Sequence, residues 1–201
     1  MDKYTHIKLT AYNGNMQLPK LGLVIFTFGN VSAADHKLGV FAIKPSGVPY
    51  EDLTPEKMIV VDFDAKVIEG DLRPSSDTKT HAVLYKHCSE MGGIVHTHST
   101  YATAWAQALR EIPNYGTTHA DHSVYDIPCA SPMSDAMIAG DYEHETGFQI
   151  LNCLKENELS YKDIEKFVKA LLHVLCQWEK DCSKNNRNIS DSLSSCSMDH
   201  G

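Results

Sequence analysis

Two histidines, His96 and His98, end the apolar stretch GGIVHTH at residues 92–98. If this stretch is a short buried strand, residues two apart project from the same face, so the two imidazole rings lie side by side. Two such rings suit one divalent metal ion such as zinc. Two buried histidines that hydrogen-bond and bind nothing have the same spacing, so the pair alone leaves both interpretations open.

Three turns rich in small residues have the composition of a phosphate-binding site. The stretch RPSSDTKTH places Ser75, Ser76 and Asp77 at a helix start, where free amides and the helix dipole favour an anion. Asp77 could equally be a plain N-cap. The stretches FGNVSA and IKPSGV are two more turns at strand ends, and Lys44 belongs to the second. Each alone predicts only a turn; together with the lysine they indicate a phosphate cradle.

A possible acid/base group lies further along the chain, in the stretch GTTHADHSVYDIPC. Asp121 stands there between His119 and His122. Most acids among polar residues are solvated surface groups, whereas in a cleft Asp121 could act as a general acid or base.

The elements that must position these residues alternate between strands and helices, which predicts an α/β fold. Pro19 should end any N-terminal helix, and Gly14 disfavours a helix there. Ser99 or Thr100 should cap the helix that follows the histidines. The expected strands are 23–28, 39–47, a hairpin at 58–70 and 92–98; the expected helices are 75–88, 101–109, 135–157 with breaks at Gly140 and Gly147, and 161–178.

Composition narrows the class of protein. The 201 residues, 42% of them hydrophobic, predict one domain at 1–182 and a polar, poorly ordered tail at 183–201. A net charge of −8 gives no reason to expect nucleic acid or an anionic membrane as partner. The sequence has no membrane-length apolar stretch, and its start lacks the apolar core of a signal peptide. Six cysteines without a CxxC pair favour free thiols in the cytoplasm.

Six stretches in this order resemble the L-ribulose-5-phosphate 4-epimerases of the class II aldolase and epimerase family, almost continuously from about residue 12 to residue 152. They are LPKLGLVIFTFGNVSA, GVFAIKPSGVPYEDLTPEKMIVVD, VIEGDLRPSSDTKTHAVLY, GGIVHTHSTYATAWAQA, IPNYGTTHADHSVYDIPC and YEHETG. The resemblance implies a three-layer sandwich, in which helices flank a central, mostly antiparallel mixed sheet. It also implies a metal-dependent sugar-phosphate enzyme that forms a homotetramer.

The resemblance assigns roles to individual residues. A divalent ion, Zn2+ or another metal such as Mn2+, is held by His96, His98 and a later histidine, His173, with Asp77 at the same centre. Asp121 is one of two acid/base groups, and the other is a tyrosine from a neighbouring subunit. The substrate phosphate is bound by the three turns, which carry Gly29, Asn30, Lys44, Ser46, Gly47, Ser75 and Ser76.

The implied reaction converts L-ribulose 5-phosphate to D-xylulose 5-phosphate. C4 carries no acidic C–H, so simple deprotonation cannot invert it. The resemblance implies retro-aldol cleavage of the C3–C4 bond, rotation of the glycolaldehyde phosphate and renewed bond formation. A Lewis-acid metal stabilises the enediolate. One acid/base group on each face of the aldehyde moves the hydroxyl proton. The pathway, arabinose or ascorbate catabolism, stays open.

The C-terminal part departs from the family pattern. Residues 173–180 read HVLCQWEK where the family has a segment like HGPFAWGK, and no tyrosine follows Tyr161. His173 also fits a structural histidine on an apolar helix face. From these differences we expect a weakened tetramer and slow epimerisation.

Three other functions fit part of the pattern. A class II aldolase that cleaves a ketose phosphate needs the same metal and phosphate sites. A non-catalytic interaction module like the adducin head shares the fold but lacks the metal histidines. A histidine-rich metallohydrolase would explain the histidine pair but not the phosphate turns. Metal analysis separates the enzymes from the interaction module.

Overall fold

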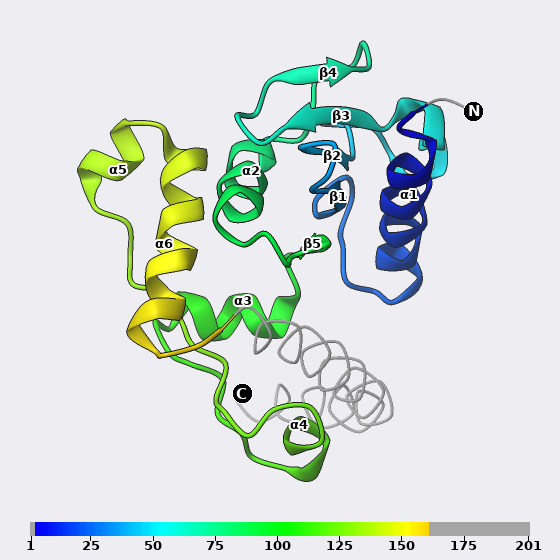
Figure 1. The fold of residues 1–201 in the computed structure, drawn as a ribbon. Helices are drawn as coiled ribbons and strands as arrows, with labels where there is room; N and C mark the ends of the chain where they lie inside the picture. Colours follow the sequence, from blue (N-terminus) through cyan, green and yellow to red (C-terminus); the bar gives the residue numbers. More distant parts are fainter. Residues whose placement is uncertain (1–2, 161–201) are drawn as a thin grey trace, which may run out of the picture.

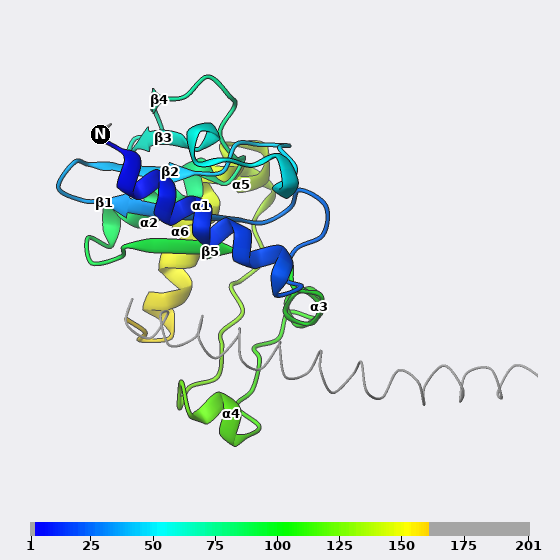
Figure 2. The same cartoon turned by 90° about the vertical axis from the view of Figure 1, so that its right-hand side faces the viewer.

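The computed structural model of the chain describes residues 3–160, whose centre is a five-stranded sheet in the order β4-β3-β2-β1-β5. Neighbouring strands in this sheet pair antiparallel. Helix α1 covers one face and α2 the other, and α6 packs against α2 (Figures 1 and 2). This confirms the predicted three-layer α/β arrangement. The elements are α1 Thr5–Lys20, β1 Asn30–Asp35, β2 Val40–Ile43, the 3-10 turns Tyr50–Asp52 and Pro55–Lys57, β3 Ile59–Asp62, β4 Val67–Glu69, α2 Thr78–His87, β5 Gly93–His96, α3 Thr100–Gln107, α4 Thr117–Ala120, α5 Asp135–Ala139 and α6 Tyr142–Glu156.

Strands β2 and β3 are apolar on both sides because helices cover both faces of the sheet. Alternate side chains of a strand point to opposite faces. Val40, Ala42 and Val60 belong to the cluster that packs with α1. The residues between them face α2 and pack with Ala82, Leu84 and Tyr85 of that helix; they are Phe41, Ile43, Ile59 and Val61. The sheet therefore forms a rigid base for whatever lies at its strand ends.

Helix α1 accommodates both residues that disfavour a helix. Pro19 is its penultimate residue, which agrees with the prediction that the helix ends there. Gly14 lies inside the helix, where a β-carbon would stand 2.7 Å from Cγ1 of Val31. The expected helical penalty is outweighed because a glycine lets α1 pack closely on β1.

The strand predicted at residues 23–28 is wrong. Strand pairing with β2 and β5 begins later, at Asn30 to Ser32, and residues 23–28 form turns. Phe26 has a φ of 56° and is 83% exposed. β-branched and aromatic composition mimics a strand here, but within residues 3–160 the segment pairs with no strand and instead forms the loop that leads into β1.

Strand β5 is shorter and more open than predicted. It ends at His96, so His98 follows the strand, and Gly93 and Val95 are exposed because β5 is the edge of the sheet. Helix α3 starts at Thr100 as expected, but the Ser99 side chain makes no capping hydrogen bond.

The remaining expectations divide between the hairpin and the two late helices. The hairpin of β3 and β4 is confirmed, with Ala65 in its turn at a φ of 63°. Gly140 separates α5 from α6 as predicted, whereas Gly147 lies inside α6.

The predicted helix at 161–178, His173 and the polar tail lie outside the described residues. Within residues 3–160 no helix is long and apolar enough to cross a membrane.

Gly147 is the contact point of α6 on α2, and we expect Gly147→Ala to destabilise the fold. A β-carbon there would lie 2.7 Å from Cβ of Val83 and 3.1 Å from the Thr80 carbonyl oxygen. Overpacking costs about 1–3 kcal/mol, more than the roughly 1 kcal/mol that alanine gains in helix propensity. In a Val83→Gly background, which removes both the Cβ and the Cγ1 that the new β-carbon would meet, the same change should cost clearly less. Urea unfolding of the four proteins measures this, and equal losses in both backgrounds would contradict the contact.

Candidate functional site

A cavity of about 230 Å³ lies where β1 begins, and its walls come from four separate parts of the chain. We call it the strand-end cavity. All seven residues predicted for phosphate binding line it, together with Asp77 and His98. Its lining is Thr27, Phe28, Gly29, Asn30, Lys44, Pro45, Ser46, Gly47, Ser75, Ser76, Asp77 and His98.

Backbone contacts bring these turns together. Gly29 has a φ of +78°, and a β-carbon on it would lie 2.6 Å from Val24 and 3.0 Å from the His96 carbonyl oxygen. Ser75 N–H donates to the Lys44 carbonyl at 3.1 Å, and Ser46 N–H donates to the Arg73 carbonyl at 2.9 Å. The Asn30 amide donates to the Ser75 hydroxyl at 3.2 Å, so the three predicted turns are joined in one wall of the cavity.

The Asp77 carboxylate turns toward β1 and does not cap α2. It accepts a hydrogen bond from the Asn30 amide at 2.5 Å and one from the Ser75 hydroxyl at 3.3 Å, and it makes no side-chain cap contact with α2. Asp77 thus occupies the N-cap position of α2, as the second interpretation expects, but its side chain bonds β1 and Ser75 instead of capping the helix. Asn30 Oδ1 is buried without a partner among the described residues, so the cavity wall keeps an acceptor for a ligand.

His96 and His98 lie together at the end of β5. Their Nε2 atoms are 3.0 Å apart, and His96 Nε2 is 4.0 Å from Oδ2 of Asp77. Burial lowers the pKa of His96, while Asp77 raises it and His98 lowers it, so His96 favours the neutral form that can donate a lone pair. Two ligand nitrogens on a tetrahedral zinc are about 3.3 Å apart, given Zn–N bonds of about 2.0–2.1 Å.

This spacing fits two adjacent ligand positions as well as a hydrogen-bonded pair. Between residues 3 and 160 no three His, Cys, Asp or Glu side chains converge as a complete metal site. The predicted third histidine, His173, lies outside this range. The described chain thus provides two imidazoles that fit a metal, with one carboxylate nearby.

Lys44 is a buried cation with one weak polar contact among the described residues. Its side chain is 2% exposed and lies 3.3 Å from the Thr27 carbonyl oxygen and 4.9 Å from the centre of the Tyr50 ring. No carboxylate of residues 3–160 forms an ion pair with it. Burial lowers the pKa of the Lys44 ammonium, because desolvation penalises the charged form. A negatively charged ligand in the cavity would offset that penalty.

Asp121 is not among the residues that line the strand-end cavity. It follows the short helix α4 and is exposed. Both views place α4 on an arm that extends away from the sheet (Figures 1 and 2). Within one chain the structure therefore keeps the predicted acid/base group apart from the predicted metal and phosphate residues.

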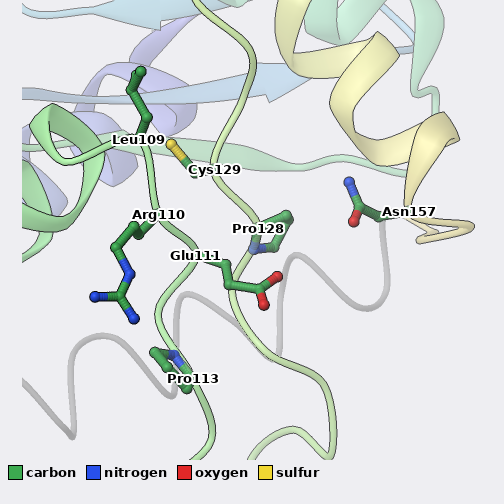
Figure 3. A pocket seen from close by; sticks show the side chains of 7 residues that line it. All are labelled: Leu109, Arg110, Glu111, Pro113, Pro128, Cys129 and Asn157. Atoms are coloured by element: carbon green, nitrogen blue, oxygen red, sulfur yellow. The ribbon is translucent and has the colours of Figure 1, made fainter.

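A second cavity lies at the base of that arm and contains none of the predicted site residues. Its volume is about 390 Å³ (Figure 3). Its lining is Leu109, Arg110, Glu111, Pro113, Pro128, Cys129 and Asn157. The chemistry-bearing residues therefore gather at the strand-end cavity instead.

Sequence reasoning missed three buried residues beside this cavity. The Tyr50 hydroxyl donates to the carbonyls of Phe28 and Gly29 at 3.1 and 2.9 Å, which holds the loop before β1 in place. Ser99 Oγ is buried next to His98 without a partner in the described chain. His81 lies four residues after Asp77 on α2 and is 1% exposed. The four-residue helical spacing could have revealed His81. Ser99 is predicted only as a helix cap, and Tyr50 carries no sequence signal.

Comparison with known proteins identifies the family of the chain. Residues 11–157 match the model of the Class II Aldolase and Adducin N-terminal domain. Proteins named L-ribulose-5-phosphate 4-epimerase UlaF, from Salmonella paratyphi C (strain RKS4594) and Salmonella typhi, are 53% identical over 152 residues, which are 76% of this chain and 67% of each relative.

Two solved aldolase structures share the fold. An L-fuculose 1-phosphate aldolase superposes with a TM-score of 0.61 at 20% identity, covering 87% of this chain and 96% of the other. The L-fuculose-1-phosphate aldolase of Thermus thermophilus gives 0.53 at 24% identity, with 68% and 69% covered. The chain belongs to the class II aldolase and adducin N-terminal domain family.

Proposed function

We propose that the chain is a metal-dependent L-ribulose-5-phosphate 4-epimerase, which inverts C4 by retro-aldol cleavage and renewed aldol addition. The carrying observation is Lys44, a buried ammonium without a carboxylate partner in the described chain, in a cavity that also holds serine hydroxyls and His98. The names of the relatives that are 53% identical support this choice of substrate. Epimerisation of L-ribulose 5-phosphate by the purified chain is the direct assay.

In this proposal the three turns bind the substrate phosphate. Lys44 supplies a desolvated positive charge, which attracts an anion more strongly than an exposed lysine does. The Ser46, Ser75 and Ser76 hydroxyls and the backbone at Gly29 and Gly47 line the same cavity. A phosphate held there keeps the aldehyde fragment in place while it rotates.

His96, His98 and Asp77 would hold the metal from the described part of the chain, and His173 remains the proposed third histidine. When bound, a divalent ion such as Zn2+ or Mn2+ supplies Lewis-acid stabilisation of negative charge on the substrate oxygens. The Asn30 amide holds Asp77 in place through a hydrogen bond. Asn30 Oδ1, unpaired within residues 3–160, can accept a hydrogen bond from a substrate hydroxyl.

Asp121 is the proposed acid/base group for one face of the aldehyde. Since α4 lies apart from the cavity within one chain, a second copy of the chain is the simplest source of this carboxylate. The proposal therefore includes the homotetramer, in which neighbouring copies share a site. A cytoplasmic location also stays part of the proposal.

Two alternatives have weaker support. A ketose-phosphate aldolase would use the same cavity, and the fold likeness to fuculose phosphate aldolases permits it. A non-catalytic module of the same family would need neither the histidine pair nor the buried lysine. The presence of His96, His98 and Lys44 therefore favours an enzyme.

Our first functional prediction concerns metal. The purified chain should bind about one divalent ion, because the two Nε2 atoms are spaced as adjacent ligands. Replacing both His96 and His98 with alanine should abolish stoichiometric binding of Zn2+, measured by elemental analysis after dialysis. His36→Ala is the control, since His36 bonds the Met91 carbonyl away from the cavity. Full occupancy in the double variant would contradict the ligand assignment.

Lys44→Met should separate stability from anion binding. Methionine fills similar space without a buried charge, so the variant should be at least as stable as the parent without anion. Inorganic phosphate should raise the melting temperature of the parent and have little effect on the variant. Lys37→Met, at an exposed position, should respond like the parent. A variant that loses stability but keeps its phosphate response would exclude Lys44 from the anion site.

Mixing two inactive variants tests whether Asp121 acts in a neighbouring copy. Asp121→Asn and Lys44→Met should each lower epimerisation, by about 10²–10⁴-fold for the acid/base group. If copies share sites, co-assembled mixtures contain sites with an intact Lys44 and Asp121, and activity should rise above that of either variant. A mixture that is no more active than its components would show that Asp121 acts within its own chain or not at all.

A further inference from the structure

Three buried polar side chains form a hydrogen-bonded chain between β1 and α2. Ser32 Oγ lies 2.8 Å from Nδ1 of His81 and 2.7 Å from the Tyr85 hydroxyl. Each of the three residues is at most 1% exposed. Groups this deep must be paired for stability.

Only one placement of the two hydroxyl protons gives each of them an acceptor among these hydrogen bonds. The Tyr85 proton needs an acceptor, and Ser32 Oγ is the side-chain acceptor that the structure gives it. The Ser32 proton then needs an acceptor of its own, and Nδ1 of His81 is the one within reach. Nδ1 therefore accepts, and a neutral His81 carries its proton on Nε2.

Burial keeps His81 neutral, because desolvation lowers its pKa well below the ordinary value. Asp77 raises that pKa and His96 lowers it, so His81 interacts electrostatically with both groups. With Nδ1 engaged and Nε2 protonated, His81 has no free lone pair for a metal. It cannot serve as the missing third ligand, and its role must be indirect.

The position of the chain indicates that role. Asn30 and Ser32 lie two apart on β1 and so point to the same face, toward Asp77 and His81, which lie four apart along α2. Ser32 also pairs with Ile94 of β5, two residues before His96. The Ser32 hydroxyl therefore ties α2 to β1 at the point where β5 joins the sheet.

We propose that Ser32, His81 and Tyr85 are positioning residues, whose hydrogen-bonded chain fixes α2 along β1 and thereby holds Asp77 beside His96. The inference deepens the proposed function, because it takes Asp77 and the histidine pair as the metal centre. Removing the Ser32 hydroxyl leaves His81 Nδ1 unpaired and frees α2 to shift. Metal binding should then weaken although no ligand has changed.

Co2+ is the probe, since its visible spectrum reports ligand geometry as well as affinity. Ser32→Ala should lower Co2+ affinity by about 10–100-fold, as loss of a supporting hydrogen bond does at metal sites, and should change the spectrum. The matched control is Asn15→Ala. Asn15 is buried and bonds both backbone groups of Val31, so it supports β1 from α1 on the opposite face. It should lower the melting temperature and leave Co2+ affinity and spectrum unchanged.

Imidazole nitrogen NMR of the metal-free protein tests the same inference without metal. The parent and Tyr85→Phe should show the Nε2–H tautomer of His81, whereas Ser32→Ala should show a mixture and shifted His96 signals. Asn15→Ala should leave both histidines unchanged. A parent that binds no Co2+ would refute the proposed metal centre, and the His96 signals would then decide the positioning role.

Three results would overturn the positioning role. One is a Ser32→Ala protein with parental Co2+ affinity and spectrum, and another is such a protein with parental His96 signals. The third applies if Ser32→Ala does not fold. Tyr85→Phe, which removes one end of the chain and keeps the ring, should then show a smaller loss of Co2+ affinity; no loss at all would overturn the role.

Discussion

The candidate site depends on a row of hydrogen-bonded polar side chains between β1 and α2, which we call the polar seam. Asn30 and Ser32 come from β1, and Asp77, His81 and Tyr85 come from the start and the body of α2. Two residues of a strand advance by about 6.6 Å and four residues of a helix by about 6 Å, so polar side chains at those spacings stay opposite one another. Asn30 meets Asp77, and Ser32 meets His81 and Tyr85. The other buried contacts between α2 and the sheet are apolar and non-directional, so these buried hydrogen bonds set the register of the helix on β1.

Satisfied and unsatisfied polar groups are separated in space. Deep in the seam, Ser32, His81 and Tyr85 satisfy one another. At the cavity Asn30 Oδ1 and Ser99 Oγ, among the described residues, are buried and unpaired, and the Lys44 ammonium faces no carboxylate of that part of the chain. Proteins depart from full satisfaction mainly where a ligand completes the structure. The seam thus provides stability, and the cavity keeps its polar groups for the ligand.

The sequence predicted elements where local pattern and tertiary context agreed. The apolar runs predict β2 and β3, the stretch Ser75–Asp77 predicts where α2 starts, and Gly140 predicts a break, and the structure agrees with all three. Residues 23–28 were not, because strand composition says nothing about whether a neighbouring strand exists. The pattern predicts a break at Gly147, because glycine disfavours a helix. The contact that requires this glycine is with Val83, 64 positions away, and the local sequence does not reveal it.

The same distinction holds for the site. Small-residue turns and the histidine pair were visible as motifs, and the fold brings the turns to one cavity. The seam was not visible, since Ser32, His81 and Tyr85 resemble ordinary core and helix residues until β1 and α2 are aligned.

Gly29 also has a consequence for altering substrate size. Any side chain at Gly29 would clash with Val24 and the His96 carbonyl and would also have a disfavoured φ. This part of the cavity wall therefore accepts no substitution. Gly47 has open space around its missing β-carbon and tolerates asparagine best at its φ of +71°. Of these two glycines, only Gly47 can therefore be substituted to change the shape of the cavity.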